Sequence, residues 1–162
     1  HLNPLYSTRH EFPSLGMSGD HALPFKYQYR WPRPSVTVDC IIYTLDEQRP
    51  CILLIKRKND PCKGFWALPG GFVDENEGLE AAARRELEEE TGVTGCAMVQ
   101  TGAYGDPGRD PRGHTITVAF MAWAPSVEAC RVQAGDDAAE AQFHPLNHLP
   151  KMSFDHLKVS LV

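Results

Sequence analysis

Three glutamates, Glu86, Glu89 and Glu90, have the type and spacing to bind a metal ion. At about 100° per residue of a helix, they fall on the same face as the apolar Leu79. Carboxylates this close repel one another, and at the carboxyl end of a helix the macrodipole favours cations. A hard cation such as Mg²⁺ relieves both penalties, because it binds carboxylate oxygens while keeping waters and substrate phosphates as other ligands. The pattern predicts phosphate chemistry, against the alternative of a solvated acidic helix paired with Arg84 and other cations.

The helix that must position these glutamates is predicted over 79–90, because helix-forming residues occupy nearly every position and Gly92 stands where a C-cap glycine does. Earlier in the chain, alternating apolar and polar residues predict a first strand over 36–42, and 68–71 is predicted to be a turn. Further strands are predicted at 51–55, 65–67, 96–101, 115–124 and 141–143, and a late helix at 154–161. The helix with the glutamates thus follows a turn and lies between two groups of strands.

The chain of 162 residues is expected to form one folded domain preceded by an arm. Its hydrophobic share of 42% and charged share of 23% are those of a globular protein, and this length buries a sufficient core without disulfides. Residues 1–34 contain five prolines and scattered glycines, a composition that resists regular structure. We therefore expect a Pro-rich, aromatic arm over 1–34 and the domain over 35–162.

Charge and cysteine content exclude several classes of protein. The net charge of −5 lacks the basic footprint of a duplex nucleic-acid binder, and the longest apolar run, 118–125, is far shorter than the roughly 18 residues that span a bilayer. The five cysteines form no CxxC pair, which argues against a disulfide framework and a thiolate zinc site. We expect a cytoplasmic protein with no nucleic-acid or membrane partner. An organelle address removed before His1 stays open, because the sequence begins without methionine.

The string GFVDENEGLEAAARRELEEETGV, residues 71–93, matches every fixed position of the box that defines the Nudix hydrolases, a family that this chain resembles. The resemblance implies an α/β/α sandwich with a mixed β-sheet and a loop-helix-loop that holds Mg²⁺ or Mn²⁺ against a diphosphate. The order of the predicted strands and helices agrees with it. The implied metal ligands are Glu86, Glu90, Glu89 when further ions bind, and the carbonyl of Gly70.

The resemblance also implies a reaction in which water attacks one phosphorus of a nucleoside diphosphate linked to another group. A general base must activate the water, and in this family it often lies on a late loop outside the box. Here that loop is 135–140, so Glu140 and Asp137 are candidates, with Glu89 of the box as the alternative. The alternative is that Glu140 and Asp137 belong to a solvated turn before a strand and have no catalytic role. Arg85 is expected to orient the carboxylates, and Glu77 to brace the loop.

Two stretches outside the box resemble the ADP-ribose pyrophosphatase branch of the family. Residues 63–72 lead into the box as they do there, and 105–114 resembles a loop of the type RDPRGH. The segment Phe154-Asp155-His156 recurs there as well, although its residues alone indicate no catalytic duty.

Four residues are candidates for substrate binding. Arg109 and Arg112 offer forked donors to phosphate oxygens, with pairing to nearby aspartates as the alternative. Arg57, at the end of a predicted strand, is a further phosphate candidate. Trp66 is a candidate for stacking on adenine, with a place in the core as the alternative.

The resemblance to this branch, together with these residues, predicts a Mg²⁺-dependent pyrophosphatase that cleaves ADP-ribose to AMP and ribose 5-phosphate. Another dinucleotide or nucleotide sugar, such as FAD, NADH or a GDP-sugar, is the alternative within the class. A different class is a sensor that binds an ADP-ribose-like ligand without turnover, as some relatives joined to a DNA-binding winged helix do. Relatives are commonly homodimers, so a homodimer is also expected.

Overall fold

The structure, a computed structural model, describes residues 29–130, 132–135 and 138–161. Pro32–Val162 form one compact unit, to which all the helices and strands below belong. The arm predicted at 1–34 lies almost entirely outside the described residues. The boundary between arm and domain therefore stays a prediction.

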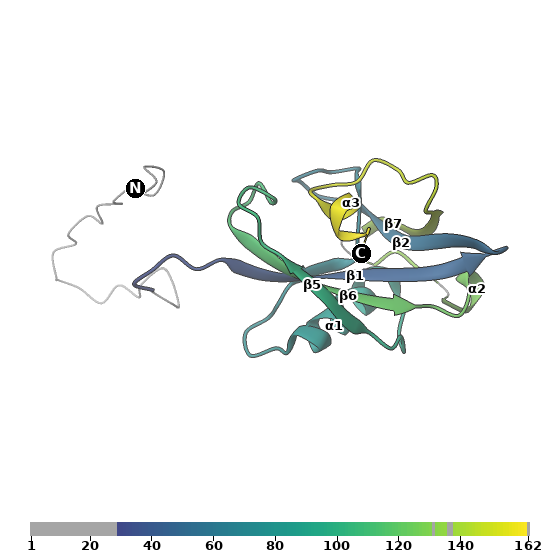
Figure 1. Ribbon diagram of the computed structural model, residues 1–162, viewed down its shortest axis with the longest axis horizontal. Helices are drawn as coiled ribbons and strands as arrows, with labels where there is room; N and C mark the ends of the chain where they lie inside the picture. The colour runs from purple at the N-terminus through teal and green to yellow at the C-terminus, as the bar shows by residue number, and fades with distance from the viewer. Residues whose placement is uncertain (1–28, 131, 136–137, 162) are drawn as a thin grey trace. The chain divides into compact units, whose positions relative to one another are not determined.

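The unit is built on a mixed β-sheet, with seven strands in the described residues (Figure 1). Five strands lie in the order β3-β2-β1-β6-β5, while β4 pairs with β1 and β7 pairs with β2. The strands are β1 (Ser35–Asp46), β2 (Arg49–Arg57), β3 (Trp66–Ala67), β4 (Gly70–Phe72), β5 (Val99–Tyr104), β6 (Thr115–Trp123) and β7 (Ala138–Pro145). Every strand expected from the sequence is present, and β4 is an addition, because the predicted turn continues as a short strand beside β1.

The strands β1 and β2 separate at one end of the sheet, and the candidate site described below lies at this opening. The two strands form antiparallel pairs only at 43–46 of β1, whereas 37–39 of β1 pair with β4 instead. On its other side β1 runs parallel to β6 along most of its length. The glycine-rich strand β4 therefore enters the middle of the sheet, next to the end of β2.

Helices cover both faces of the sheet, as Figure 1 shows for α1 (Leu79–Thr91) and α3 (His156–Val159). The buried side chains of α1 pack on β-strand residues that include Val38, Cys40 and Leu53. On the opposite face, Val159 of α3 packs with Ile41 and its neighbours. A short helix, α2 (Val127–Cys130), follows β6. The expected α/β/α sandwich with a mixed sheet is thus confirmed.

The glutamate-bearing helix is close to its prediction, with one correction. Gly92 adopts the left-handed conformation of a C-cap, with φ 71°, and donates its N–H to the carbonyl of Glu88 at 2.8 Å. Glu86 and Glu90 flank the buried stripe of α1, but the side chain of Glu89 is 59% exposed. The placement of Glu89 on the inward face was wrong, because it lies about 100° around the helix from Glu90.

Other boundaries shift where tertiary contacts decide them. The strand predicted from 96 begins at Val99, because Cys96 lies in the core under α1 and its carbonyl accepts from Arg84 instead of a strand partner. The last strand is longer than predicted and pairs with β2 along its length. The late helix is shorter than predicted, because Phe154 has φ 52°, which no right-handed helix allows.

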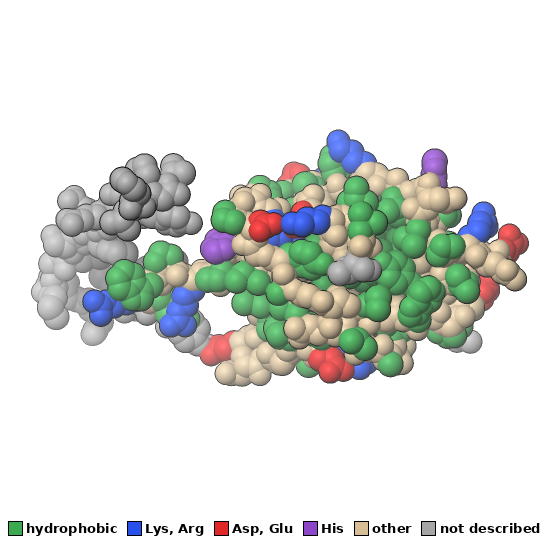
Figure 2. Space-filling model, viewed as in Figure 1, with side chains coloured by type: hydrophobic (Ala, Val, Ile, Leu, Met, Phe, Trp, Pro, Cys, Tyr) green, Lys and Arg blue, Asp and Glu red, His purple; other side chains and the backbone are tan. Residues whose placement is uncertain are grey.

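Figure 2 shows hydrophobic side chains over much of the visible face, with acidic and basic side chains scattered around it. Large exposed apolar side chains include Val99 on β5 and Trp123 on β6. In the described part of the chain, no helix is long and apolar enough to cross a membrane. The expected homodimer stays a prediction.

Candidate metal and diphosphate site

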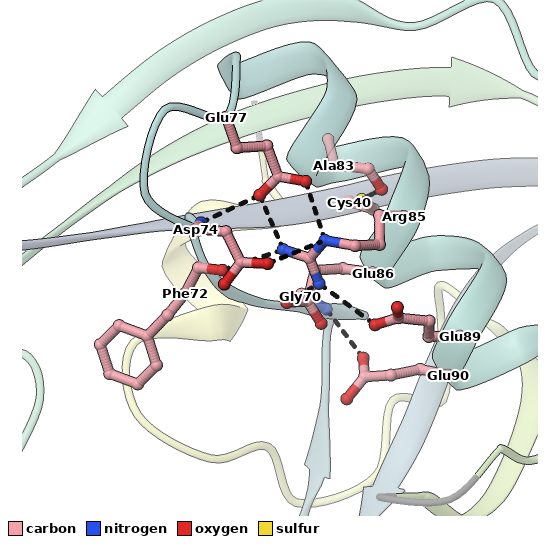
Figure 3. A network of polar contacts seen from close by, with 10 residues as sticks. All are labelled: Cys40, Gly70, Phe72, Asp74, Glu77, Ala83, Arg85, Glu86, Glu89 and Glu90. Atoms are coloured by element: carbon pink, nitrogen blue, oxygen red, sulfur yellow. Dashed lines mark hydrogen bonds and ion pairs between the residues drawn. The ribbon is translucent and has the colours of Figure 1, made fainter.

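Arg85 is the centre of a carboxylate network on α1 and the loop before it (Figure 3). Its Nε donates to Glu77 Oε1 at 2.8 Å, and its Nη1 donates to Glu86 Oε1 at 2.8 Å and Glu89 Oε2 at 3.1 Å. Its Nη2 donates to Glu77 Oε2 at 2.9 Å and to the carbonyl of Phe72 at 3.1 Å. One guanidinium therefore ties the helix to the loop and to the end of β4.

Glu77 fixes the loop between β4 and α1. Besides the Arg85 fork, its Oε2 accepts the backbone N–H of Asp74 at 2.9 Å. The hydrogen bonds from Arg85, and then that from Asp74, hold the pKa of Glu77 at about 2. Glu77 is thus ionised at neutral pH, and its pairing keeps Arg85 aimed at the other carboxylates.

Glu86 is a largely buried carboxylate, with 13% of its side chain exposed. Burial raises its pKa, while the hydrogen bond and charge of Arg85 act against this rise. Gly71 of β4 lies directly against it, and a side chain at position 71 would overlap the carboxylate. The absence of a Cβ at Gly71 therefore lets Glu86 reach the sheet opening.

Glu90 lies one helical turn further on and faces the same strand. Its Oε2 accepts the backbone N–H of Gly70 at 2.8 Å. Gly70 pairs with Asp39 of β1, so Glu90 is anchored to the middle of the sheet. The two box glutamates, Glu86 and Glu90, thus approach the two consecutive glycines Gly71 and Gly70.

The donor set suits a hard divalent cation. Glu86 and Glu90 bring anionic oxygens to one end of the sheet opening, where burial raises the pKa of Glu86. In the described residues, no three acidic, histidine or cysteine side chains are gathered as a ready metal site. Arg85 donates to Glu86, and the Gly70 amide donates to Glu90. A metal ion would replace or share those contacts, and carboxylate oxygens are the ligands that Mg²⁺ and Mn²⁺ prefer.

A cleft of about 330 Å³ opens beside these carboxylates. Its lining comes from the end of β2, the glycines of β4, the helix α1 and the loop before β6. The lining residues with charged side chains are Arg57, Lys58, Asp74, Arg85, Glu86, Glu90 and Arg112. The cleft therefore holds cations together with the carboxylates that suit a metal.

Of the predicted substrate residues, the structure brings Arg57 and Arg112 to this cleft. The Nε of Arg57 donates to the carbonyl of Pro61 at 2.8 Å. Arg112 pairs with Asp110, its Nη2 lying 2.7 Å from Oδ2, as the alternative interpretation expected. Its side chain is still 39% exposed, and both arginines also line an adjoining cavity of about 50 Å³.

Arg109 lies in the wall of that smaller cavity and is engaged within the protein. Its Nε and Nη2 donate to the carboxylate of Asp155 at 2.9 Å and 2.6 Å, and Asp39 lies 3.8 Å away. Only 5% of the side chain is exposed. Arg109 is therefore paired with Asp155, and not with a nearby aspartate of its own loop or with solvent. These contacts do not favour substrate binding by Arg109.

Trp66 and Glu140 lie elsewhere. Both neighbour Lys56 across the strands, so all three side chains lie on the α3 face of the sheet. Trp66 packs edge-on against His144 and joins the core on that face, and neither Trp66 nor Glu140 lines the cleft. Glu140 Oε1 accepts from Lys56 Nζ at 2.8 Å. Asp137, the other late candidate for the general base, lies outside the described residues.

Two residues that the sequence did not single out for the site, His156 and Asp39, line the smaller cavity. His156 Nδ1 accepts the backbone N–H of Leu68, two residues before Gly70, at 2.9 Å. Burial lowers the pKa of His156, and because Nδ1 accepts this hydrogen bond, the proton of the neutral ring lies on Nε2. That Nε2 lies 3.8 Å from a carboxylate oxygen of Asp39. The signals in the sequence were the recurring Phe154-Asp155-His156 segment and a carboxylate at Asp39 within the first predicted strand.

The chain is similar in sequence and in structure to several known proteins. Residues 33–161 match the NUDIX domain model. The ADP-ribose pyrophosphatase of Methanocaldococcus jannaschii is 50% identical over 126 residues, which are 78% of this chain and 70% of that protein. The ADPR responsive transcriptional repressor NtrR of Acinetobacter baylyi is 41% identical over 67% of this chain and 44% of its own length.

Among solved structures, the NUDIX domain of Shewanella oneidensis NrtR complexed with ADP ribose superposes with a TM-score of 0.74 and 34% identity. The match covers 83% of this chain and 90% of that domain. The box at 71–93, the sandwich fold and these matches agree with one another. The chain belongs to the Nudix family and is a Nudix hydrolase.

Proposed function

We propose that this Nudix hydrolase cleaves the diphosphate of ADP-ribose to AMP and ribose 5-phosphate, with Mg²⁺ or Mn²⁺ as the cofactor. The observation that carries the proposal is a single cleft lined both by Glu86 and Glu90 and by Arg57 and Arg112. Its volume of about 330 Å³ lies at the lower end of small-molecule sites. The 50% identity to a relative named ADP-ribose pyrophosphatase supports the choice of substrate.

The residues that would hold the metal are Glu86 and Glu90, with the carbonyl of Gly70 and the more exposed Glu89 as further ligands. When bound, the metal neutralises phosphate oxygens and lowers the pKa of the attacking water. Arg85 holds the carboxylates in position through its hydrogen bonds to Glu86 and Glu89. Arg57 and Arg112 bind and orient the diphosphate through their cationic donors.

Of the two candidates that the structure describes, we take Glu89 as the general base, because it lies on the helix of the proposed metal ligands while Glu140 lies on the α3 face of the sheet. The side chain of Glu89 is 59% exposed on the helix that carries Glu86 and Glu90, and Arg85 Nη1 holds one of its oxygens at 3.1 Å. Glu140 is tied to Lys56 outside the cleft. A Glu89→Gln variant is expected to lose the acidic limb of the pH–rate profile, whereas Glu140→Gln is expected to keep it.

Product analysis tests the substrate. The purified protein is incubated with ADP-ribose, NADH, FAD and GDP-mannose, with and without Mg²⁺, and the products are separated by chromatography. Metal-dependent release of AMP from ADP-ribose, fastest in the panel, is the expected result. Turnover of another member of the panel without turnover of ADP-ribose would keep the metal site and overturn the substrate.

A second candidate function is a sensor that binds ADP-ribose without cleaving it. It is favoured by the similarity to a repressor described as ADPR responsive and to a NUDIX domain complexed with ADP ribose. The two functions differ in turnover, because a sensor binds ADP-ribose and returns it unchanged. Binding by calorimetry together with silence across the panel would favour the sensor over the hydrolase proposed above.

A further inference from the structure

Phe154 lies beside both arginines of the cleft. The guanidinium carbon of Arg57 is 5.0 Å from the centre of the Phe154 ring, and that of Arg112 is 5.4 Å from it. An aromatic ring attracts a cation within about 6 Å of its centre. One ring therefore contacts two cations that come from β2 and from the loop before β6.

Each arginine has further contacts besides the Phe154 ring. Arg57 donates to the carbonyl of Pro61 at 2.8 Å. Arg112 pairs with Asp110 and also lies 5.0 Å from the centre of the Phe72 ring. Two cations held at one ring repel each other, and within the described residues Asp110 offsets only the charge of Arg112, so an anion with two adjacent charges that reaches both arginines adds the compensation that Arg57 lacks.

The backbone holds the Phe154 ring in place at an unusual conformation. Its φ of 52° is uncommon for a bulky side chain and persists only where the surroundings impose it. On one side Ser153 donates its N–H to the carbonyl of Trp66 at 2.8 Å, and on the other His156 accepts from Leu68. The segment is thus fastened to the strand and turn that lead into β4.

Packing in the hydrophobic core does not explain the position of the Phe154 ring. Phe154 is half-buried and belongs to none of the hydrophobic clusters formed by the described residues. It lines the smaller cavity, together with Arg57 and Arg112. Besides the tilted ring of His156, whose centre lies 5.3 Å away, its ring contacts are with the two guanidinium groups, which it supports.

We propose that Phe154 is a positioning residue that holds Arg57 and Arg112 as a two-cation clamp, and that this clamp makes the site prefer a diphosphate to a monophosphate. The inference rests on the proposed function in so far as the substrate carries a diphosphate. A monophosphate reaches one of the two guanidinium groups, whereas a diphosphate reaches both through the donors that Pro61 and Asp110 leave free, so the spacing of the two arginines matters chiefly for the diphosphate. Loss of the ring lets the two cations move apart.

The test compares two ligands that the protein does not hydrolyse at a diphosphate bond: AMP and the methylene-bridged analogue of ADP. Both affinities are measured by calorimetry with saturating Mg²⁺, for the wild type, Phe154→Leu and Phe154→Tyr. Phe154→Leu is expected to weaken binding of the ADP analogue about tenfold and binding of AMP about threefold or less. The loss is larger for the ADP analogue because it uses both arginines, and each of them loses its cation–π contact with the ring. Phe154→Tyr keeps the ring and is expected to restore the wild-type preference.

Because a leucine at position 154 can also disturb folding, a fluorinated phenylalanine series at position 154 provides a second measurement. Fluorine weakens the negative face of the ring with little change of shape, so the preference for the ADP analogue is expected to fall stepwise with each fluorine. Equal loss of both affinities, an unchanged preference, or a wild type that binds both ligands equally would overturn the proposal. None of these results depends on turnover, so a failure of ADP-ribose hydrolysis alone would leave the inference standing.

Discussion

The carboxylate of Glu86 occupies the space that a side chain of residue 71 would need, because Gly71 of β4 lies directly against it. This contact joins the strand that enters the sheet opening to the helix that carries the glutamates. A side chain added at position 71 is expected to displace this carboxylate and not the backbone, because the atoms in the way belong to the end of a flexible side chain.

Gly71→Ala is therefore expected to displace the Glu86 carboxylate while leaving the fold intact. The apparent affinity for Mg²⁺ in the hydrolysis assay is expected to weaken about 10- to 100-fold, the size of effect seen when the supports of metal ligands are lost. Gly78→Ala is the matched control, because a Cβ at position 78 meets no atom within 4 Å. Equal Mg²⁺ affinity in the two variants would show that Glu86 does not ligate the metal.

Glu86→Gln keeps the size of the side chain and removes its charge. It is expected to lower kcat/KM at least about 100-fold, because a metal ligand matters at least as much as its supports. The control is Glu88→Gln on the exposed side of the same helix, which is expected to retain activity. Steady-state kinetics with ADP-ribose and circular dichroism of both variants check the assignment, and unchanged turnover in Glu86→Gln would contradict it.

The fold and the box were predictable because local patterns carry them. Alternation of side chains marked the strands, helix formers marked α1, and Gly92 marked its end. The wrong placement of Glu89 on the inward face shows the limit of that reasoning. A helical wheel gives the direction in which a side chain leaves the helix, but not the width of the buried stripe. The match of residues 71–93 to the family box placed Glu86 and Glu90 together.

The rest of the site depends on contacts between distant parts of the chain, which one sequence does not reveal. Arg109 and its partner Asp155 are separated by 46 residues, and Leu68 and His156 by 88. A sequence pattern offered only nearby aspartates as partners for Arg109. The support of two arginines by Phe154 likewise requires three segments to meet, and no local rule relates them.

Acidification is expected to weaken the Glu77–Arg85 tether. The pKa of Glu77 falls from its ordinary value of 4.5 to about 2 in the folded protein, chiefly through the hydrogen bonds from Arg85. Because the unfolded chain binds the proton more readily, the stabilisation is complete above pH about 4.5 and is lost as the pH falls toward 2. The difference in unfolding free energy between wild type and Glu77→Gln, measured by urea denaturation, should shrink over that range. A difference that stays constant from pH 7 to pH 3 would rule out the ionised tether.

Asp155→Asn breaks the buried pair with Arg109 and tests whether that arginine is structural. The Arg109 side chain is 5% exposed and that of Asp155 is 19% exposed, so the variant leaves a cation largely out of water. The free energy of unfolding is expected to fall by about 3 kcal/mol, the lower end for breaking a buried pair, because Asp39 remains 3.8 Å from Arg109. Asp106→Asn, which breaks the exposed pair with Lys158, is the control and is expected to change stability little. Urea denaturation of the three proteins decides the matter, because an Asp155→Asn variant as stable as the control would mean that Arg109 keeps its charge solvated and is available to a substrate.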